Sequence, residues 1–388
     1  MDEHHLLAPG PTPVPENARL AMAKRLIHHR SDEFREVFRR VRSGLQWIFQ
    51  TDEDVITLTS SGTGAFEAAM TNFLSPGSTV VVVGGGKFGE RWADVARRYD
   101  LDVVEMDVEW GEAADPAQLA DILADREDVS MVTVTHSETS TGVLHPLEDL
   151  ADVVQRESSA LLAVDGITSV GVHDVPMDEL GVDVLVGGSQ KAFGAPPGLG
   201  FVAVSARAWR RQPDDHLGGY YFDLSRERRR QSQDQTAFTP GISQVLALDV
   251  TLDMMRDEGR RSVFERHRLN AEATRTAVDA VGLELFGARP SNAVTAVLAP
   301  DGIPAPQIVD RMNDTYGAVI AGGQKHMSSE LLRLGHIGFF RRTDILTMVS
   351  SLELCLRDLG HSADAGTATA AAQRVYTNAS HQDVPSEP

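Results

Sequence analysis

Residues 182–205, with the sequence VDVLVGGSQKAFGAPPGLGFVAVS, decide which class of fold this chain adopts. The segment contains two apolar runs, 182–189 and 199–205, joined by a turn rich in glycine and proline. Both runs are apolar at consecutive positions, which is typical of strands covered by helices on both faces. Strands of this kind belong to mainly parallel sheets, so the segment predicts an α/β fold.

Similar runs precede this segment and alternate with stretches of helical periodicity, the first of which covers 17–50. The runs are 55–60, 78–85, 101–107, 129–137 and 160–166. Together with the two runs above, they predict a mainly parallel sheet of seven strands between helices. We expect this sheet to form the core of a large domain over residues 17–255.

Three shorter parts complete the chain. Residues 1–16 are rich in proline and are expected to form an extended arm. Residues 256–360 combine helical periodicity with two strand-like runs, 292–300 and 318–323, and are expected to form a smaller α+β domain. Residues 361–388 are poor in apolar side chains and are expected to be disordered.

The composition disfavours several classes of partner. A net charge of −20 argues against nucleic acid, which needs concentrated lysine and arginine. The chain has no apolar run long enough to span a membrane. Cys355 is the single cysteine, so an internal disulfide and a cysteine-rich metal site are excluded, and we expect no metal. The first residues lack the apolar stretch of a secretory signal, so we expect a cytoplasmic protein.

The chain has four lysines, and Lys191 lies within the segment that decides the fold. Its neighbours are small or apolar, so we expect its side chain to be buried. Burial disfavours the charged form of a lysine, which frees the amine to act as a nucleophile and a base. The competing interpretation is a structural lysine that reaches solvent from the end of a strand.

Asp165 lies in ALLAVDGITSVG (160–171), at the carboxyl end of a predicted strand. In parallel α/β sheets, ligands bind outside the carboxyl ends of the strands. A carboxylate buried there needs a partner, and a cationic pyridinium nitrogen would suit it. A helix cap or a structural ion pair would also explain this residue.

Two glycine-rich segments each follow a predicted strand and precede a helix. In SSGTGAFEAA (60–69), the amides at the start of the helix form a potential anion site, although an ordinary helix cap is the alternative. In VVVGGGKFGERW (81–92), Gly84, Gly86 and Gly89 match G-x-G-x-x-G, and Glu105 lies 21 residues beyond Gly84. This spacing is typical of dinucleotide binding, so an NAD-dependent oxidoreductase is an alternative hypothesis. It leaves Lys191 and the first segment unexplained.

A phosphate loop, an acid for a ring nitrogen and a buried lysine together indicate pyridoxal 5'-phosphate, whose chemistry a protein tunes by positioning it. The segments PGPTPVP (9–15), HSETSTGVLHPL (136–147), GSQKAFGAPPG (188–198) and LLRLGHIG (331–338) carry a resemblance. With them, nearly the whole chain except the tail resembles the class V aminotransferases, in particular the serine–pyruvate and alanine–glyoxylate group. The resemblance implies the type I fold of pyridoxal-phosphate enzymes. It also implies transfer of an amino group from alanine or serine to glyoxylate or pyruvate, in a homodimer with shared active sites.

The resemblance also implies roles for individual residues. Lys191 would bind the cofactor covalently, and Asp165 would pair with its ring nitrogen. The other cofactor-binding residues would be Ser61, Gly62 and Thr63 at the phosphate, Phe88 stacked on the ring, Thr139 near the ring hydroxyl, Gln190 beside the lysine, and Thr239 from the neighbouring chain. Arg333 would bind the substrate carboxylate through its planar fork of donors.

Two positions depart from the family pattern, and other reactions remain open. Phe88 replaces the usual tryptophan, and Thr236 replaces an aromatic residue expected to reach the partner's phosphate site. Aminophosphonate or ureidoglycine transaminases and class V lyases are alternatives within the family. A desulfurase would need a reactive cysteine on a loop, whereas Cys355 lies in an apolar helical segment expected in the core. A catalytically inactive regulatory relative would not need Lys191.

Overall fold

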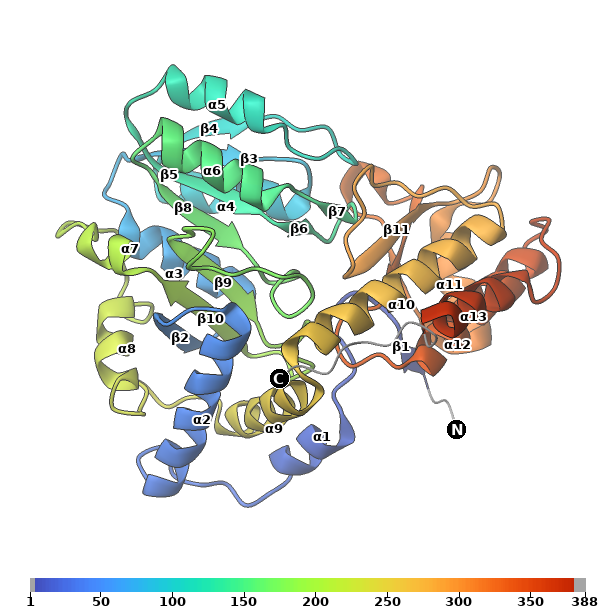
Figure 1. Cartoon of the computed structure of the whole chain (residues 1–388), viewed down its shortest axis with the longest axis horizontal. Coiled ribbons are helices and arrows are strands. Elements are labelled where there is room, and N and C mark those ends of the chain that lie inside the picture. The colour runs from blue at the N-terminus through green and yellow to red at the C-terminus, as the bar shows by residue number, and fades with distance from the viewer. Residues whose placement is uncertain (1–3, 380–388) are drawn as a thin grey trace.

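Seven strands form the central sheet of the larger domain in the computed structural model, which describes residues 4–379 (Figure 1). Their order is β2-β10-β9-β8-β5-β3-β4, and β10 alone runs antiparallel to its neighbours. The strands are β2 Asp54–Thr59, β3 Thr79–Val83, β4 Asp102–Met106, β5 Val129–Thr135, β8 Leu161–Asp165, β9 Val184–Gly188 and β10 Leu199–Val204. The predicted mainly parallel, seven-stranded sheet is confirmed.

Helices cover both faces of this sheet, as the apolar runs predict. Successive strand residues point to opposite faces, so Val81 and Val83 pack in one apolar cluster and Val80 and Val82 in another. The first cluster includes side chains of α2 Asp32–Phe49, α5 Pro116–Ala124 and α6 Leu147–Glu157. The second includes side chains of α3 Gly62–Phe73 and α4 Lys87–Arg98.

The predicted helical stretch at 17–50 is two helices rather than one. The first, α1, covers Glu16–Met22, and α2 begins only at Asp32. The break has a local cause, because Ser31 caps α2 by accepting a hydrogen bond from Phe34 N at 3.2 Å. The remaining helices of the larger domain are α7 Ala206–Arg210, α8 Leu224–Gln231 and α9 Ile242–Glu258.

The smaller domain is built on an antiparallel sheet in the order β11-β14-β13. Its strands are β11 Val294–Leu298, β13 Ala321–Gly322 and β14 Leu331–Gly335, and its helices are α10 Arg260–Ala280, α11 Ala305–Tyr316 and α12 Arg342–Asp358, with a short 3₁₀ helix at Lys325–Met327. Cys355 is buried in α12, as expected. A two-stranded sheet, β6 Ser137–Glu138 and β7 Val143–Leu144, lies between the two domains in Figure 1.

The expected disorder of 361–388 is wrong for the part that the structure describes. Residues Thr367–Ala379 form a helix, α13, that packs its alanine face against α10 and α12. Buried Glu353 accepts hydrogen bonds from Gly366 N at 2.6 Å and Ala368 N at 2.7 Å at the start of this helix. These contacts join residues 13 and 15 positions apart, and composition alone does not indicate them. Residues 380–388 lie outside the described range.

The N-terminal arm joins the two domains. Its strand β1, His5–Leu6, pairs in parallel with β12, Ala318–Val319, in the smaller domain. Leu7 O then accepts a hydrogen bond from Gly335 N at 2.8 Å. A few residues further on, Thr12 N donates to Gln190 O at 3.0 Å in the larger domain.

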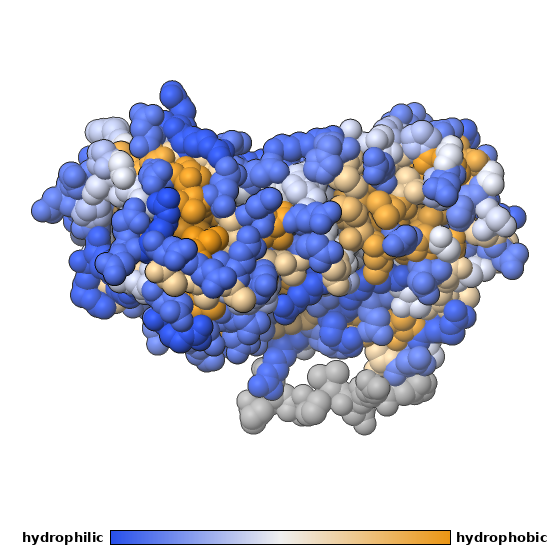
Figure 2. All heavy atoms as spheres, turned by 90° about the horizontal axis from the view of Figure 1, so that it is seen from above, coloured by the Kyte–Doolittle hydropathy of each residue, from blue (hydrophilic) through white to orange (hydrophobic). Residues whose placement is uncertain are grey.

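The surface in Figure 2 is mostly hydrophilic, with apolar side chains gathered in separate areas. This agrees with a chain in which 24% of the residues are charged. None of the helices in residues 4–379 is both long enough and apolar enough to cross a membrane.

Candidate active site

Lys191 follows β9 at the carboxyl end of the sheet and is 8% exposed, whereas the other three lysines are exposed or half-buried. Its Nζ donates a hydrogen bond of 2.6 Å to the carbonyl of Pro9 in the N-terminal arm. Burial, together with the nearby charge of Arg333, lowers the pKa of Lys191 to about 8, while the charges of Asp165 and Glu138 oppose this shift. The side chain is therefore the buried and readily deprotonated amine that the sequence predicts.

Asp165 ends β8 and is 3% exposed. Its Oδ1 accepts a hydrogen bond from Ile167 N at 2.9 Å, and Oδ2 accepts none from residues 4–379. Burial raises the pKa of Asp165 to about 7, while the Ile167 bond and the charge of Lys191 act against this shift. The free oxygen is suited to a cationic ring nitrogen, which would hold the carboxylate ionised.

The segment 60–63 forms the turn between β2 and α3. Ser61 occupies the capping position, but its side chain makes no capping bond. Among the described residues, the amides of Gly62 and Thr63 also lack an acceptor. A Cβ on Gly62 would lie 2.2 Å from Cδ1 of Ile167, so this turn packs directly against the loop that follows Asp165. Free amides at a helix N-terminus fit a phosphate group.

The second glycine-rich segment is filled by the protein itself. Glu138 is fully buried, and its Oε2 accepts hydrogen bonds from Phe88 N at 2.9 Å and Gly89 N at 3.1 Å. A Cβ on Gly86 would come within 2.3 Å of the Glu138 side chain. A carboxylate therefore already occupies the helix terminus where a pyrophosphate would bind, and Glu105 pairs with Arg97. The dinucleotide interpretation is contradicted.

Three more predicted residues differ in burial and in their hydrogen-bond partners. Phe88 is half-buried in the first turn of α4. Thr139 is buried, and its hydroxyl lies 2.7 Å from the hydroxyl of Thr168, in the loop after Asp165. Gln190 directly precedes Lys191, and its buried Oε1 has no donor among residues 4–379. An unpaired buried oxygen is costly, which marks it as a position for a ligand donor.

Arg333 lies on β14 of the smaller domain and is 7% exposed. Its Nε donates to Gly322 O at 2.8 Å and its Nη1 to Thr139 O at 3.2 Å, so it contacts both domains. Burial lowers the pKa of Arg333 to about 10, and the charge of Glu138 opposes this shift. Its Nη2 has no acceptor in the described residues and can bind a substrate carboxylate.

These residues fit pyridoxal phosphate, because free amides, a free carboxylate oxygen and a buried amine lie on adjoining loops. The sequence profile of the family described as Aminotransferase class-V matches residues 17–341. The chain belongs to the class V aminotransferases. Enzymes of this class use pyridoxal phosphate, so the predicted family, fold type, cofactor and enzyme class are confirmed.

Similar proteins cover nearly the whole of this class V aminotransferase. The "Soluble hydrogenase 42 kDa subunit" of Anabaena cylindrica is 45% identical over 97% of this chain and 100% of its own. The serine–glyoxylate aminotransferase of Methylorubrum extorquens is 33% identical over 95% of each chain. The solved structure of a Thermus thermophilus aspartate aminotransferase is 34% identical, covers 91% of this chain and 99% of its own, and superposes with a TM-score of 0.86.

Thr239 is exposed beside the end of β2 in this aminotransferase. It lies in a small surface depression with Thr59 and Tyr221, and Gly241 N donates to Thr59 Oγ1 at 3.1 Å. Thr236 is buried instead, and its hydroxyl donates to Phe238 O at 2.6 Å within the same chain. Thr239 is thus presented outward and Thr236 inward.

Three features of the site were not predicted from the sequence. Glu138 lies within a quoted motif, yet its contact with α4 joins residues about 50 positions apart. Arg91, one helical turn after Phe88, donates to Thr63 Oγ1 at 3.1 Å. The third feature is the Pro9 carbonyl, and a signal for it exists in the sequence: Gly10 allows the arm to approach, because a Cβ there would lie 2.6 Å from Lys191 Nζ.

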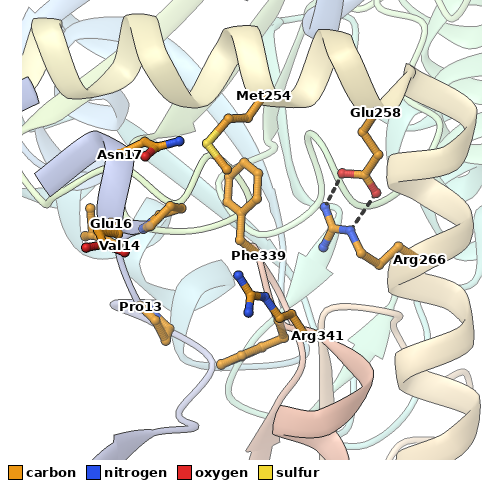
Figure 3. A pocket seen from close by; sticks show the side chains of 11 residues that line it. Pro13, Val14, Glu16, Asn17, Met254, Glu258, Arg266, Phe339 and Arg341 are labelled. Atoms are coloured by element: carbon orange, nitrogen blue, oxygen red, sulfur yellow. Dashed lines mark hydrogen bonds and ion pairs between the residues drawn. The ribbon is translucent and has the colours of Figure 1, made fainter. Parts of the chain in front are cut away.

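A separate cavity of about 420 Å³ lies between the N-terminal arm, α9, α10 and the start of α12 (Figure 3). A two-pronged ion pair crosses one side of it, with Arg266 Nε and Nη2 donating to the Glu258 carboxylate at 2.6 and 3.0 Å. None of the predicted site residues lines this cavity. It marks the junction of the two domains rather than the catalytic centre.

Proposed function

We propose that this aminotransferase transfers an amino group from alanine or serine to glyoxylate or pyruvate. The observation that carries the proposal is the geometry of Arg333. It is buried on β14, its Nε and Nη1 are bonded to backbone carbonyls, and its Nη2 has no acceptor among residues 4–379. One cation at the reacting amine suits substrates with one carboxylate. The similarity to a serine–glyoxylate aminotransferase supports the same substrate size.

Each side chain then has a defined task. Arg333 holds the substrate carboxylate and so directs the substrate Cα toward Lys191 Nζ. Lys191, whose pKa is lowered, accepts the proton from the substrate Cα. It donates a proton back to Cα when the second substrate receives the amino group. Asp165 keeps the ring nitrogen protonated through its free oxygen. When bound, pyridoxal phosphate supplies the electron sink for this chemistry.

A homodimer with shared active sites is part of the proposal. Thr239 and Tyr221 are exposed beside the phosphate loop, which is where a ligand residue from a second copy would approach. In this proposal, Thr239 of each chain contacts the phosphate site of the other. A cytoplasmic location remains a prediction from the sequence.

A half-reaction screen tests the substrate choice. The purified enzyme is mixed with single amino acids, and loss of the visible absorbance of the bound cofactor is followed over time. Alanine and serine are expected to react at least about ten times faster than aspartate, because a second carboxylate would lack a second cation. Aspartate as the fastest donor would overturn the proposed substrates but leave the reaction class intact.

The reaction class has its own test. Borohydride should remove the absorbance of the holoenzyme, and Lys191→Ala should lose transamination by about 10⁴-fold or more because the covalent and proton-transfer roles are both lost. Full activity in Lys191→Ala would refute the assignment. Lys24→Ala, which changes an exposed lysine, serves as the matched control.

A further inference from the structure

Arg91 places a cation beside the phosphate loop. It lies in α4, one turn after Phe88, and its Nη1 donates to Thr63 Oγ1 at 3.1 Å. Its guanidinium carbon lies 4.7 Å from the centre of the Phe88 ring. Neither partner carries a negative charge. No carboxylate in residues 4–379 lies within 4.0 Å of this guanidinium, so its charge has no ionic partner within that range.

The adjoining turn lacks a formal positive charge. Ser61, Gly62 and Thr63 offer hydroxyl and amide donors and the positive end of a helix dipole, which corresponds to roughly half a charge. A phosphate monoester carries close to two negative charges at neutral pH. The turn alone therefore leaves most of that charge uncompensated, and an unpaired arginine contacts one of its three residues.

We propose that Arg91 binds the phosphate of the cofactor from within the same chain, together with Thr63. The inference deepens the proposed function and rests on it, because it places a specific charge at the phosphate site. Thr63 links the two groups, since its oxygen accepts from Arg91 while its hydroxyl hydrogen remains free for the phosphate. Stacking on Phe88 fixes the guanidinium plane, so little side-chain entropy is lost on binding.

A comparison of two ligands separates this role from a merely structural one. The full-length protein is prepared without cofactor, and its affinities for pyridoxal phosphate and for pyridoxal are measured by absorbance. Arg91→Gln should lower the affinity for pyridoxal phosphate by about 10- to 100-fold and leave the affinity for pyridoxal unchanged within about twofold. Arg91→Lys, which keeps the charge but loses the planar fork, should recover part of the loss.

Arg97→Gln is the matched control, because Arg97 lies on the same helix but pairs with Glu105 at the surface. It should leave both affinities unchanged. Inorganic phosphate gives a second readout: it should raise the melting temperature of the wild-type and Arg97→Gln proteins but not of Arg91→Gln.

Two outcomes would overturn the inference. If Arg91→Gln lowers the affinities for both ligands equally, Arg91 only supports Phe88. If the variant binds each ligand as tightly as the wild type does, Arg91 has no role at the phosphate. In either case a wild type that still transaminates leaves the proposed function standing. A wild type that neither transaminates nor prefers the phosphorylated ligand would remove both.

Discussion

The two glycine-rich turns of this enzyme have the same local architecture and opposite contents. In each, a buried strand leads through glycines into the N-terminus of a helix, α3 after 60–63 and α4 after 84–86. The amides at the start of α4 are already bonded, two to Glu138 and one to Ser140 Oγ at 3.0 Å. Those of Gly62 and Thr63 have no acceptor among the described residues. Glycine spacing indicates a tight turn. Whether the turn can bind a ligand depends on whether a side chain from another segment already bonds its amides.

The strongest way to break this contrast is to give the first turn a carboxylate of its own. Thr63→Asp should lower the affinity for pyridoxal phosphate by about 1000-fold, because the new charge repels the phosphate at close range. The same charge favours the N-terminus of α3, so the unfolding free energy of the cofactor-free protein should stay equal or rise by about 0.5 kcal/mol. Titration and thermal melts measure the two effects; Thr63→Asn is the neutral control.

The two buried carboxylates sharpen the contrast. Glu138 accepts four hydrogen bonds, whereas Asp165 accepts one. Because the pKa of Asp165 is raised from 3.8 to about 7 in the fold, its stabilising contribution is present below pH 3.8 and is lost as the pH rises to about 7. Asp165→Asn should therefore stabilise the cofactor-free protein by about 4 kcal/mol at pH 8 and by nothing below pH 3.8.

Denaturant melts of the cofactor-free protein across this pH range measure the effect. Asp310→Asn, at an exposed position on α11, should show no such trend. If Asp165→Asn does not raise the free energy of unfolding at pH 8, the ionised Asp165 does not destabilise the cofactor-free protein.

The filled turn can also be tested by crowding. Gly86→Ala should destabilise the protein by about 2 kcal/mol, because the added methyl group would meet the Glu138 carboxylate. The backbone there is extended, so the cost is steric. Gly219→Ala, which meets nothing within 4 Å, should leave the melting temperature unchanged. Similar stability in both variants would show that Glu138 does not fill the turn.

The two serines of the turns give a smaller difference. Ser140 is buried, accepts from Lys87 N and donates to Glu138 at 2.6 Å, so Ser140→Ala should cost about 1 to 2 kcal/mol of stability. Ser61 makes no capping bond, and Ser61→Ala should keep the stability but bind pyridoxal phosphate a few times less tightly. Chemical denaturation and cofactor titration of both variants measure the contrast, and a reversed pattern would contradict it.

The smallest expected effect is a null one. NAD should not raise the melting temperature of the cofactor-free enzyme, because the α4 terminus is occupied, whereas pyridoxal phosphate should raise it by several degrees. A clear shift with NAD would reopen the role of Gly84, Gly86 and Gly89.

The sequence predicts the sheet well because its signals are local. Lys191 and Asp165 each lie in or beside a continuous apolar run, and strand ends in a parallel sheet meet at one edge. The contacts that escape prediction join distant segments. Glu138 reaches the start of α4, Arg91 reaches the preceding loop, and Glu353 caps a helix in a stretch whose composition indicates disorder. Their residue types are ordinary, and only their neighbours in space give them a role.

The N-terminal arm also limits how far the enzyme can open. Leu7 is bonded to the strand that carries Arg333, and Thr12 is bonded to the backbone on either side of the reactive lysine, at Gln190 and Lys191. Five residue steps separate these two anchors, and a fully stretched chain of that length spans about 18 Å. The arm is thus a tether of limited length between the strand that carries Arg333 and the segment that carries Lys191. Any wider opening during product release requires the hydrogen bonds at one end of the arm to break.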